Sequence, residues 1–442
     1  MGLGKLPSRR ARFLTAFLVI GISVLLYIEP VTAATFTNPI AEYGQDPWVI
    51  YHDGYYYYAS SGWGGLLVSK ARKLQDIGVV IPVKVWTPPT GTPYSKEIWA
   101  PELHYLDGKW YIYFAADDGK NVNHRMYVLE GNSQNPQGSY TFKGQLKPST
   151  DLWAIDGTVL ALGNGERFLV WSGYVGPYVP WNPYRQNLYI AQMSNPWTIN
   201  GDRHLLSRPQ YDWESVYEPS QGGWWKLNEG PEVLKRNDKI HIIYSASAAT
   251  SETYCLGQLT YSSGDVLDAN SWVKKRTAVF SGTSEVYGPG HASFTKSPDG
   301  TEDWIVYHSK KNTGWNFDRQ VSAQKFTWNA NDEPVFGSPI APGVPIQEPS
   351  GTTQTSTSAP TTAPVTTTAA TSSLTVSASK SGPSTSMGSI TTAEAALEQG
   401  WTVPQFALLA IGAAVVVGVV ILRRGRPRRK EQRQPANIDV PG

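Results

Sequence analysis

Five polar residues that could act in acid–base chemistry recur along the chain: Asp46, Glu102, Asp156, Glu229 and His291. Each opens a short apolar segment, which is followed by a Gly- or Asp-containing turn and then by a segment rich in aromatic residues. The intervals between them are 56, 54, 73 and 62 residues. Carboxylates and imidazoles are the groups that most often move protons in catalysis, so together they would make an acid–base site.

The repeat also predicts the elements that position these residues. Intervals of this length are close to the period at which a four-stranded sheet recurs as a propeller blade. In a radial arrangement the first strand of each blade lies nearest the axis, so the five leading residues should meet at one mouth of the channel. Because the copies cover nearly all of residues 35–348, we expect one all-β domain, a five-bladed β-propeller.

The N-terminal segment and the segment after the repeat differ from the domain in composition. Residues 1–34 have a basic start, an apolar run and small residues near the end, as in a signal peptide, with an uncleaved N-terminal anchor as the alternative. Residues 349–400 are rich in Ser and Thr and have no periodic apolar pattern. Such a composition cannot bury a core, so we expect a disordered, O-glycosylated linker.

A short apolar run near the C-terminus predicts a membrane anchor. We place a transmembrane helix at residues 404–422, where about 17 uncharged residues stand at the lower limit for crossing a bilayer. The tail at 423–442 begins with seven Lys or Arg, which fits a cytoplasmic end, whereas a lipid-anchor signal would end on the hydrophobic stretch. We therefore expect a type I cell-surface protein anchored in the lipid bilayer, or released to the medium if the anchor is clipped.

Charge and cysteine content limit the partners of the domain. Residues 35–348 hold 26 Lys and Arg against 31 Asp and Glu, so the basic balance of the whole chain belongs to its termini and no nucleic-acid surface is expected. Cys255 is the single cysteine, so the domain has no internal disulfide and depends on its core. We expect a monomer.

Aromatic content indicates carbohydrate binding. The chain has 17 Trp and 24 Tyr, and flat rings with polar edges fit the C–H faces of sugars. Packing between blades is the alternative, to which we assign about two thirds of these rings. The better candidates for ligand contact are the tryptophans of predicted loops: Trp63, Trp86, Trp99, Trp153, Trp181, Trp224, Trp225 and Trp315.

Five motifs in order resemble those of glycoside hydrolase family 43. They are QDPWV at 45–49, IWAPELH at 98–104, AIDGTV at 154–159, NEGPEV at 228–233 and GPGHASF at 288–294. The resemblance implies a five-bladed propeller with an inverting active site, most similar to the exo-acting α-L-arabinofuranosidases. The family also contains β-xylosidases and endo-arabinanases.

The resemblance also implies roles for the three acids. Inversion needs a base that activates water and an acid that protonates the leaving oxygen, with the two carboxyls roughly 6.5–9.5 Å apart. Asp46 matches the general base, Glu229 the general acid, and Asp156 the carboxylate that orients the substrate and raises the pKa of the acid. Crowded like charges favour keeping one proton, so Glu229 can enter the reaction protonated.

Each acid also has a structural interpretation when taken singly. Asp before Pro opens turns, Asp-Gly makes hairpin turns, and Glu-Gly-Pro can start a strand. Glu232, three residues after Glu229, is a competing candidate for the acid. Three acids at corresponding points of a repeat, all inside matching motifs, favour catalysis.

The remaining candidates have weaker signals. Glu102 matches no catalytic position and is expected to be a substrate or structural contact, while Trp99 and Trp225 are expected to contact substrate. Arg319 is expected to reach sugar hydroxyls, with an ordinary structural arginine as the alternative.

His291 matches the axial histidine of the family. The resemblance implies that it helps to hold a hydrated calcium ion through water, although calcium prefers oxygen ligands and one histidine gives no spacing signal. Hydrogen bonding to the acids is the alternative.

We therefore expect an inverting glycosidase that releases terminal α-L-arabinofuranosyl residues from arabinan or arabinoxylan. A β-xylosidase, an endo-arabinanase and a non-catalytic carbohydrate-binding propeller are the alternatives. The loops at 174–185 and 210–225 are expected to wall the pit and to select the sugar.

Overall fold

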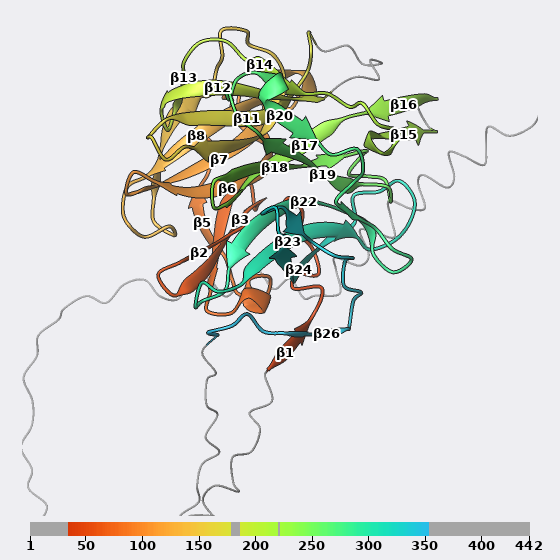
Figure 1. The fold of residues 1–442 in the computed structure, drawn as a ribbon. Coiled ribbons are helices and arrows are strands. Elements are labelled where there is room, and N and C mark those ends of the chain that lie inside the picture. The colour runs from red at the N-terminus through yellow and green to blue at the C-terminus, as the bar shows by residue number, and fades with distance from the viewer. Residues whose placement is uncertain (1–33, 178–185, 220–221, 353–442) are drawn as a thin grey trace, which may run out of the picture. The chain divides into compact units, whose positions relative to one another are not determined.

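The computed structural model describes residues 34–177, 186–219 and 222–352, which contain five antiparallel sheets arranged in chain order (Figure 1). In the first three sheets, each strand pairs with the next along the chain. Sheet one contains β2 (Trp48–His52), β3 (Tyr55–Gly62), β4 (Gly65–Ala71) and β5 (Val83–Trp86). Sheet two contains β6 (Lys96–Leu106), β7 (Lys109–Asp117), β8 (Arg125–Gly131) and β9 (Tyr140–Gln145). Sheet three contains β10 (Ala154–Ala161), β11 (Arg167–Gly173), β12 (Asn187–Asn195) and β13 (Thr198–Ile199), with β14 (His204–Ser207) also on β12.

The last two sheets follow the same plan. Sheet four contains β17 (Asn228–Arg236), β18 (Lys239–Ala246), β19 (Cys255–Tyr261) and β20 (Trp272–Lys274), with β21 (Phe280–Ser281) also on β19. Sheet five contains β22 (Tyr287–Lys296), β23 (Asp303–Lys310), β24 (Arg319–Trp328) and β25 (Pro334–Val335). A separate hairpin of β15 (Ser215–Glu218) and β16 (Gly223–Lys226) precedes sheet four. In the part of the chain that the structure describes, four single-turn 3₁₀ helices lie in the connections: η1 (Leu74–Asp76), η2 (Asn121–Asn123), η3 (Asp212–Glu214) and η4 (Ala269–Ser271).

Contacts between first strands close the five sheets into a ring. The first strand of each sheet contacts the first strand of the next, and β22 of the fifth sheet contacts β2 of the first. The chain ends of the domain reinforce this closure, because β1 (Thr35–Thr37) pairs with β26 (Pro345–Gln347). The amide of Asn38 also exchanges two hydrogen bonds with the backbone of Ala323 on β24. The predicted five-bladed β-propeller is therefore confirmed.

The core is divided into clusters that lie between neighbouring blades. Between the first two blades, for example, Val68 and Leu103 pack with Trp110. Between the second and third, Tyr111 packs with Leu169 and Trp171. The most deeply buried aromatic residues are thus the bulky side chains that fill the wedge between two radial sheets.

Local sequence determines the turns that join the first and second strands of the first two blades. Two residues, Asp53-Gly54 and Asp107-Gly108, connect the first strand of each blade to the second, and all four have a positive φ. This is the conformation of a type I′ turn, for which Asp-Gly is a preferred sequence.

Nearly all of the predicted signal peptide and Ser/Thr-rich linker, and the whole of the predicted transmembrane helix and basic tail, lie outside the described residues. Among the residues that are described, no helix is long and apolar enough to cross a membrane.

Candidate active site

Each blade has a residue with a left-handed backbone at the same point near its start. In blades two to five, this residue interrupts the pairing of the first strand with the second, as in a β-bulge. A bulge changes which face of the sheet the following side chains point to. In these four blades it lies at the same end of the first strand. The five residues are Asp46 (φ 48°), Ala100 (φ 41°), Asp156 (φ 56°), Gly230 (φ 49°) and His291 (φ 42°).

This backbone register corrects the alignment of the repeats. We aligned the second and fourth copies on Glu102 and Glu229, but the equivalent residues are Ala100 and Gly230. Glu102 lies two residues beyond its bulge and corresponds to Glu232, and Glu229 lies one residue before its own. An alignment on polar residues is wrong for the second and fourth copies, because in these blades the left-handed position holds Ala100 or Gly230, which have no functional group.

Asp46 is surrounded by groups that stabilise its carboxylate. Its Oδ1 lies 3.2 Å from Nδ1 of His291 and 3.3 Å from Nη1 of Arg319. The second terminal nitrogen of Arg319, Nη2, donates to Oε1 of Gln45 at 2.6 Å. Burial alone would raise the pKa of Asp46, but the charges of His291 and Arg319 outweigh it and hold this pKa far below its usual value. Asp46 is therefore ionised at any pH at which the protein would work.

His308 contacts the same aspartate as a neutral ring. Its Nδ1 accepts a hydrogen bond from the backbone N–H of Asp46 at 3.1 Å. Burial, aided by the nearby charge of Arg319, lowers the pKa of His308 to about 3. The 3.3 Å approach of His308 to Oδ1 of Asp46 is accordingly not an ion pair.

Asp156 and Glu229 form a second acidic group with the opposite electrostatics. Burial, together with the charges of Glu229 and Asp46, raises the pKa of Asp156 to about 7, although Gly230 donates its N–H to Oδ2 of Asp156 at 2.9 Å. Burial also raises the pKa of Glu229. Two neighbouring carboxyls that repel each other titrate as a pair, so one proton stays on the pair near neutral pH.

Two neutral side chains orient Glu229. Tyr254 donates its hydroxyl to Oε1 of Glu229 at 2.8 Å, and Gln186 donates its amide to Oε2 at 3.0 Å. Neither residue was predicted, because neither belongs to one of the five motifs. Tyr254 directly precedes β19, the third strand of the same blade, and Gln186 precedes β12 of the blade before, so only the folded chain brings them to the acid.

His291 lies among the acids as a cation. Its backbone N–H donates to Oγ of Ser245 at 2.8 Å, which fixes the bulge. Burial would lower the pKa of His291, but Asp46, Asp156 and Glu229 outweigh it and raise this pKa. The site thus combines three carboxyls with one imidazolium and one guanidinium within a buried space.

Glu102 and Glu232 form a layer beneath this group. Both are buried, and their carboxyls share a hydrogen bond. His104 contributes its Nε2 to Oε2 of Glu102 at 2.7 Å. Burial and the charge of Glu102 raise the pKa of Glu232 well above its usual value, so Glu232 keeps its proton. Glu102 thus makes its contacts with protein groups.

The two tryptophans predicted to contact substrate lie on different elements, one on the second blade and one on the separate hairpin. Trp99 is half-buried on β6, where its ring stacks on His124 with the centroids 3.9 Å apart. Trp225 lies on β16 and meets Trp315 edge to face, with the centroids 6.0 Å apart.

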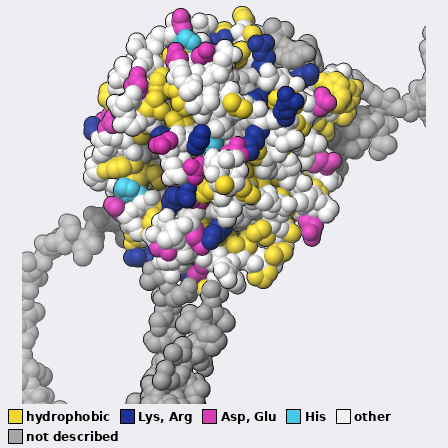
Figure 2. Space-filling view, viewed as in Figure 1, with side chains coloured by type: hydrophobic (Ala, Val, Ile, Leu, Met, Phe, Trp, Pro, Cys, Tyr) yellow, Lys and Arg dark blue, Asp and Glu magenta, His cyan; other side chains and the backbone are white. Residues whose placement is uncertain are grey.

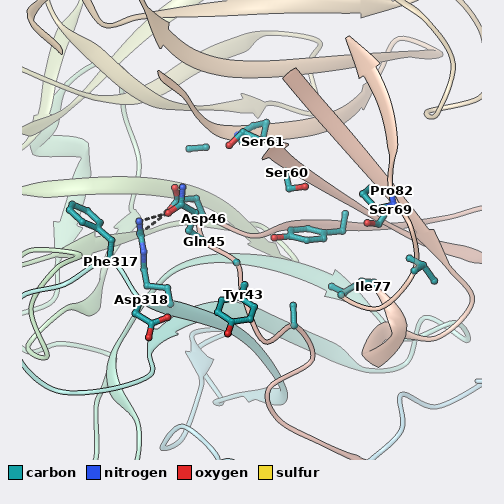
Figure 3. Close-up of a pocket in the computed structure, with 18 residues that line it drawn as sticks. Tyr43, Gln45, Asp46, Ser60, Ser61, Ser69, Ile77, Pro82, Phe317 and Asp318 are labelled. Atoms are coloured by element: carbon teal, nitrogen blue, oxygen red, sulfur yellow. Dashed lines mark hydrogen bonds and ion pairs between the residues drawn. The ribbon is translucent and has the colours of Figure 1, made fainter. Parts of the chain in front are cut away.

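A polar cavity of about 410 Å³ adjoins Asp46 on the side of the first blade. Figure 3 shows Gln45 and Asp46 towards one end of it and Ser69, Ile77 and Pro82 towards the other. On the molecular surface, Figure 2 shows acidic, basic and histidine side chains gathered near the middle of one face. Charge is therefore concentrated there, and hydrophobic side chains are exposed towards the rim.

The donor set does not provide direct ligands for a metal ion. Within the described ranges, no group of three or more His, Cys, Asp and Glu residues is arranged to hold one. His291 directs Nδ1 to Asp46, and the acids are engaged with N–H and O–H donors. An ion at the axis would have to be held through water, as the sequence resemblance implied.

Comparison with known proteins identifies relatives. A family model described as Glycosyl hydrolases family 43 matches residues 36–334. An extracellular exo-α-(1→5)-L-arabinofuranosidase of Streptomyces avermitilis is 41% identical over 330 residues, which are 71% of this chain and 65% of that protein. An α-L-arabinofuranosidase 43 of Humicola insolens is 34% identical over 324 residues, covering 70% of this chain and 65% of its own. The chain thus spans slightly less than two thirds of the length of these two relatives.

Solved structures agree with the fold. The crystal structure of an α-L-arabinofuranosidase from Lactobacillus brevis matches with a TM-score of 0.63 and 36% identity, covering 70% of this chain and 98% of that one. A thermostable family-43 glycoside hydrolase matches with a TM-score of 0.57 and 24% identity, covering 70% and 99%. At that lower identity the likeness concerns the fold alone.

Proposed function

The chain belongs to glycosyl hydrolase family 43, and from this premise we propose that it releases terminal α-L-arabinofuranosyl residues from arabinan- or arabinoxylan-type polysaccharides with inversion at the anomeric carbon. The observation that supports this most is the electrostatic division of the site. One carboxylate is held ionised, while a neighbouring pair of carboxyls retains a proton. An inverting glycosidase needs one base and one acid in these two states at the same time.

In the proposed mechanism Asp46 is the general base. It takes a proton from a water molecule as the water oxygen bonds to the anomeric carbon. The low pKa of Asp46 makes it a weak base, so its main contribution is to orient the water and to stabilise the charge that develops on it. Arg319 and His291 hold the carboxylate in place.

Glu229 is the proposed general acid. It gives its proton to the glycosidic oxygen as the bond from that oxygen to the anomeric carbon breaks, and it ends as a carboxylate. Tyr254 and Gln186 already donate to both of its oxygens, so they stabilise the anion that forms. Asp156 orients the sugar, and its charge favours retention of the proton by Glu229.

A substrate panel tests the reaction and its specificity. We expect hydrolysis of an aryl α-L-arabinofuranoside and of arabino-oligosaccharides from their non-reducing ends, with the inverted anomer of arabinose appearing first by NMR. Faster cleavage of an aryl β-xyloside would favour the xylosidase alternative. Internal cleavage of linear arabinan would favour an endo-arabinanase, and binding without turnover would favour a carbohydrate-binding propeller.

We also propose that His291 supports a hydrated calcium ion at the propeller axis. The proposal rests on the family resemblance of the histidine, which lies centrally among the carboxyls. A chelator should then lower both the melting temperature and the activity, and added calcium should restore both. If metal analysis shows that chelation leaves no calcium on the protein and the melting temperature does not change, the ion is excluded.

For location, we propose a secreted domain held at the cell surface by the C-terminal segment. The support is the order of a signal-like start, a Ser/Thr-rich linker, an apolar run and a basic tail. The Streptomyces avermitilis relative is named as extracellular. Activity should sediment with membranes and resist a carbonate wash, and truncation after Pro349 should move it to the medium. Full-length activity found only in the medium would exclude the anchor.

A further inference from the structure

A hairpin that precedes the acid carries aromatic rings on both faces. In Figure 1 the pair β15 and β16 stands apart from the five blades. Tyr217 and Trp224 are opposite each other on its two strands and are 47% and 55% exposed. The next pair along, Val216 and Trp225, places Trp225 on the other face of the hairpin.

An aromatic residue of the fifth blade also contacts this hairpin. Trp315, 37% exposed, lies in the connection between β23 and β24 and packs edge to face on Trp225. A buried lysine holds that connection in place, since Lys310 Nζ donates to the carbonyl oxygens of Gly314 and Thr250. The backbone N–H of Asn316 also donates to the carbonyl of Thr250, at 3.2 Å. Trp315 is therefore presented by a well-anchored loop.

Both segments lead directly into the catalytic centre. Glu229 lies three residues after Lys226, the last residue of the hairpin, and Arg319, which contacts Asp46, lies four residues after Trp315. The Trp225–Trp315 contact consequently links the segment before the acid to the segment before the arginine. The general acid lies next to the leaving oxygen, so the part of the substrate beyond that oxygen extends outward from the acid.

We propose that Tyr217, Trp224, Trp225 and Trp315, here named the aromatic wall, bind the sugar chain from which the arabinofuranosyl residue is cleaved. The occupant is a neutral pentose polymer, because exposed rings stack on the C–H faces of sugar rings. Tyr217 and Trp224 extend the contact outward from Trp225 and Trp315, so successive sugars of one chain can be bound. This inference rests on the proposed function and adds to it the subsites that select a polymer over a small glycoside.

The test compares a polymer with an aryl substrate in the full-length chain. Trp224→Ala and Trp315→Ala should each raise KM for arabino-oligosaccharides of several residues about three- to tenfold, the range expected from loss of one ring stacking contact. KM and kcat for the aryl α-L-arabinofuranoside should stay within twofold of wild type, because that substrate has no sugar chain to bind. Trp224→Phe keeps a flat ring and should restore most of the affinity for oligosaccharides.

Val273 provides the control, because it is a large hydrophobic side chain that is 60% exposed but belongs to β20 of the fourth blade. Val273→Ala should leave both substrates unaffected. Equal losses on oligosaccharide and aryl substrate, or unchanged oligosaccharide KM in both alanine variants, would overturn the aromatic wall. If the wild type cleaves no arabinofuranoside, the proposed function fails instead. Affinity electrophoresis in linear arabinan would then support the wall if the alanine variants lose retardation, and overturn it if they do not.

Discussion

At the scale of single residues, the two acids are distinguished by what each has to do. Asp46→Asn keeps the size of the side chain but removes the charge that orients and deprotonates water. We expect kcat to fall about 10²- to 10⁴-fold on every substrate, the range typical of a general base. Steady-state kinetics on an aryl arabinofuranoside and on arabino-oligosaccharides measure this. Activity close to that of the wild type on either substrate would show that Asp46 is not the base.

Glu229→Gln should affect the two substrates unequally. A poor leaving group such as a sugar hydroxyl needs a proton, whereas an aryl oxygen with a low pKa leaves without one. We therefore expect kcat on arabino-oligosaccharides to fall at least about tenfold more than kcat on the aryl substrate. Glu232→Gln is the control, since Glu232 was the competing candidate and is bonded to Glu102. If Glu232→Gln rather than Glu229→Gln gave the unequal loss, the acid would have to be reassigned.

The pH dependence should report the carboxyl pair. Activity requires a protonated acid, so it should fall as pH rises through the pKa at which the pair of Asp156 and Glu229 loses its proton. Asp156→Asn removes one negative charge, which lets Glu229 lose its proton more easily. The alkaline limb of kcat/KM for arabino-oligosaccharides should then move to lower pH, as well as falling in height. A limb that stays in place would mean that Asp156 does not influence the titration of the acid.

How much of this site the sequence predicts depends on the kind of residue. Asp46, Asp156, Glu229 and His291 each stand inside a motif, and the structure brings them together. Tyr254 and Gln186 could not be predicted, because tyrosine and glutamine are common and their contacts with Glu229 arise from strand pairing that the sequence does not display. Arg319 was expected to reach sugar hydroxyls, and its contacts are with Asp46 and Gln45.

At the scale of elements, the left-handed position of each first strand explains why polar residues recur with the blades but do not mark the same point in every blade. The recurring polar residues predicted four residues of the site. The feature that all five blades share is the left-handed backbone, however, and Ala100 and Gly230 adopt it although their side chains have no reactive group. A positive φ is nearly free for glycine and strained for alanine. The repeat can therefore be recognised from sequence, whereas its exact register comes from the dihedral angles.

Exchanging these two residues tests that interpretation. Gly230→Ala would place a Cβ 3.1 Å from Nδ1 of His291 in a backbone conformation with φ 49°. We expect it to destabilise the fold by about 1–3 kcal/mol. It should also lower kcat by displacing His291. Ala100→Gly relaxes the same strain in the second blade, so it should be neutral or stabilising. Chemical denaturation of both variants measures the difference, and equal effects of the two would contradict a shared left-handed position.

At the scale of the whole molecule, ring closure depends on contacts that no sequence periodicity reveals. Blade five contacts blade one through β22 and β2, and β1 pairs with β26 across more than 300 residues of sequence. The number of repeats predicts how many blades there are. The pairing of the two ends of the domain, by contrast, follows from the requirement that a sheet edge find a partner.

The buried carboxyl layer beneath the site should make stability depend on pH. Glu232 keeps its proton in the folded protein but loses it near its usual pKa when unfolded, so the folded state binds more protons above that pKa. Stability should consequently fall as pH rises, by up to about 1.4 kcal/mol per pH unit for one proton. Glu232→Gln still carries a hydrogen-bond donor towards Glu102 but cannot ionise.

The free energy of unfolding of the Glu232→Gln variant should therefore decline less than that of the wild type between pH 5 and pH 8, measured by urea denaturation at constant ionic strength. Near pH 4 the two proteins should be similarly stable, because Glu232 is then protonated in both states of the wild type. Glu42→Gln, which changes an exposed carboxylate, controls for the loss of one charge. If the free energy of unfolding of Glu232→Gln declines as steeply with pH as that of the wild type and of Glu42→Gln, then Glu232 is ionised in the folded protein.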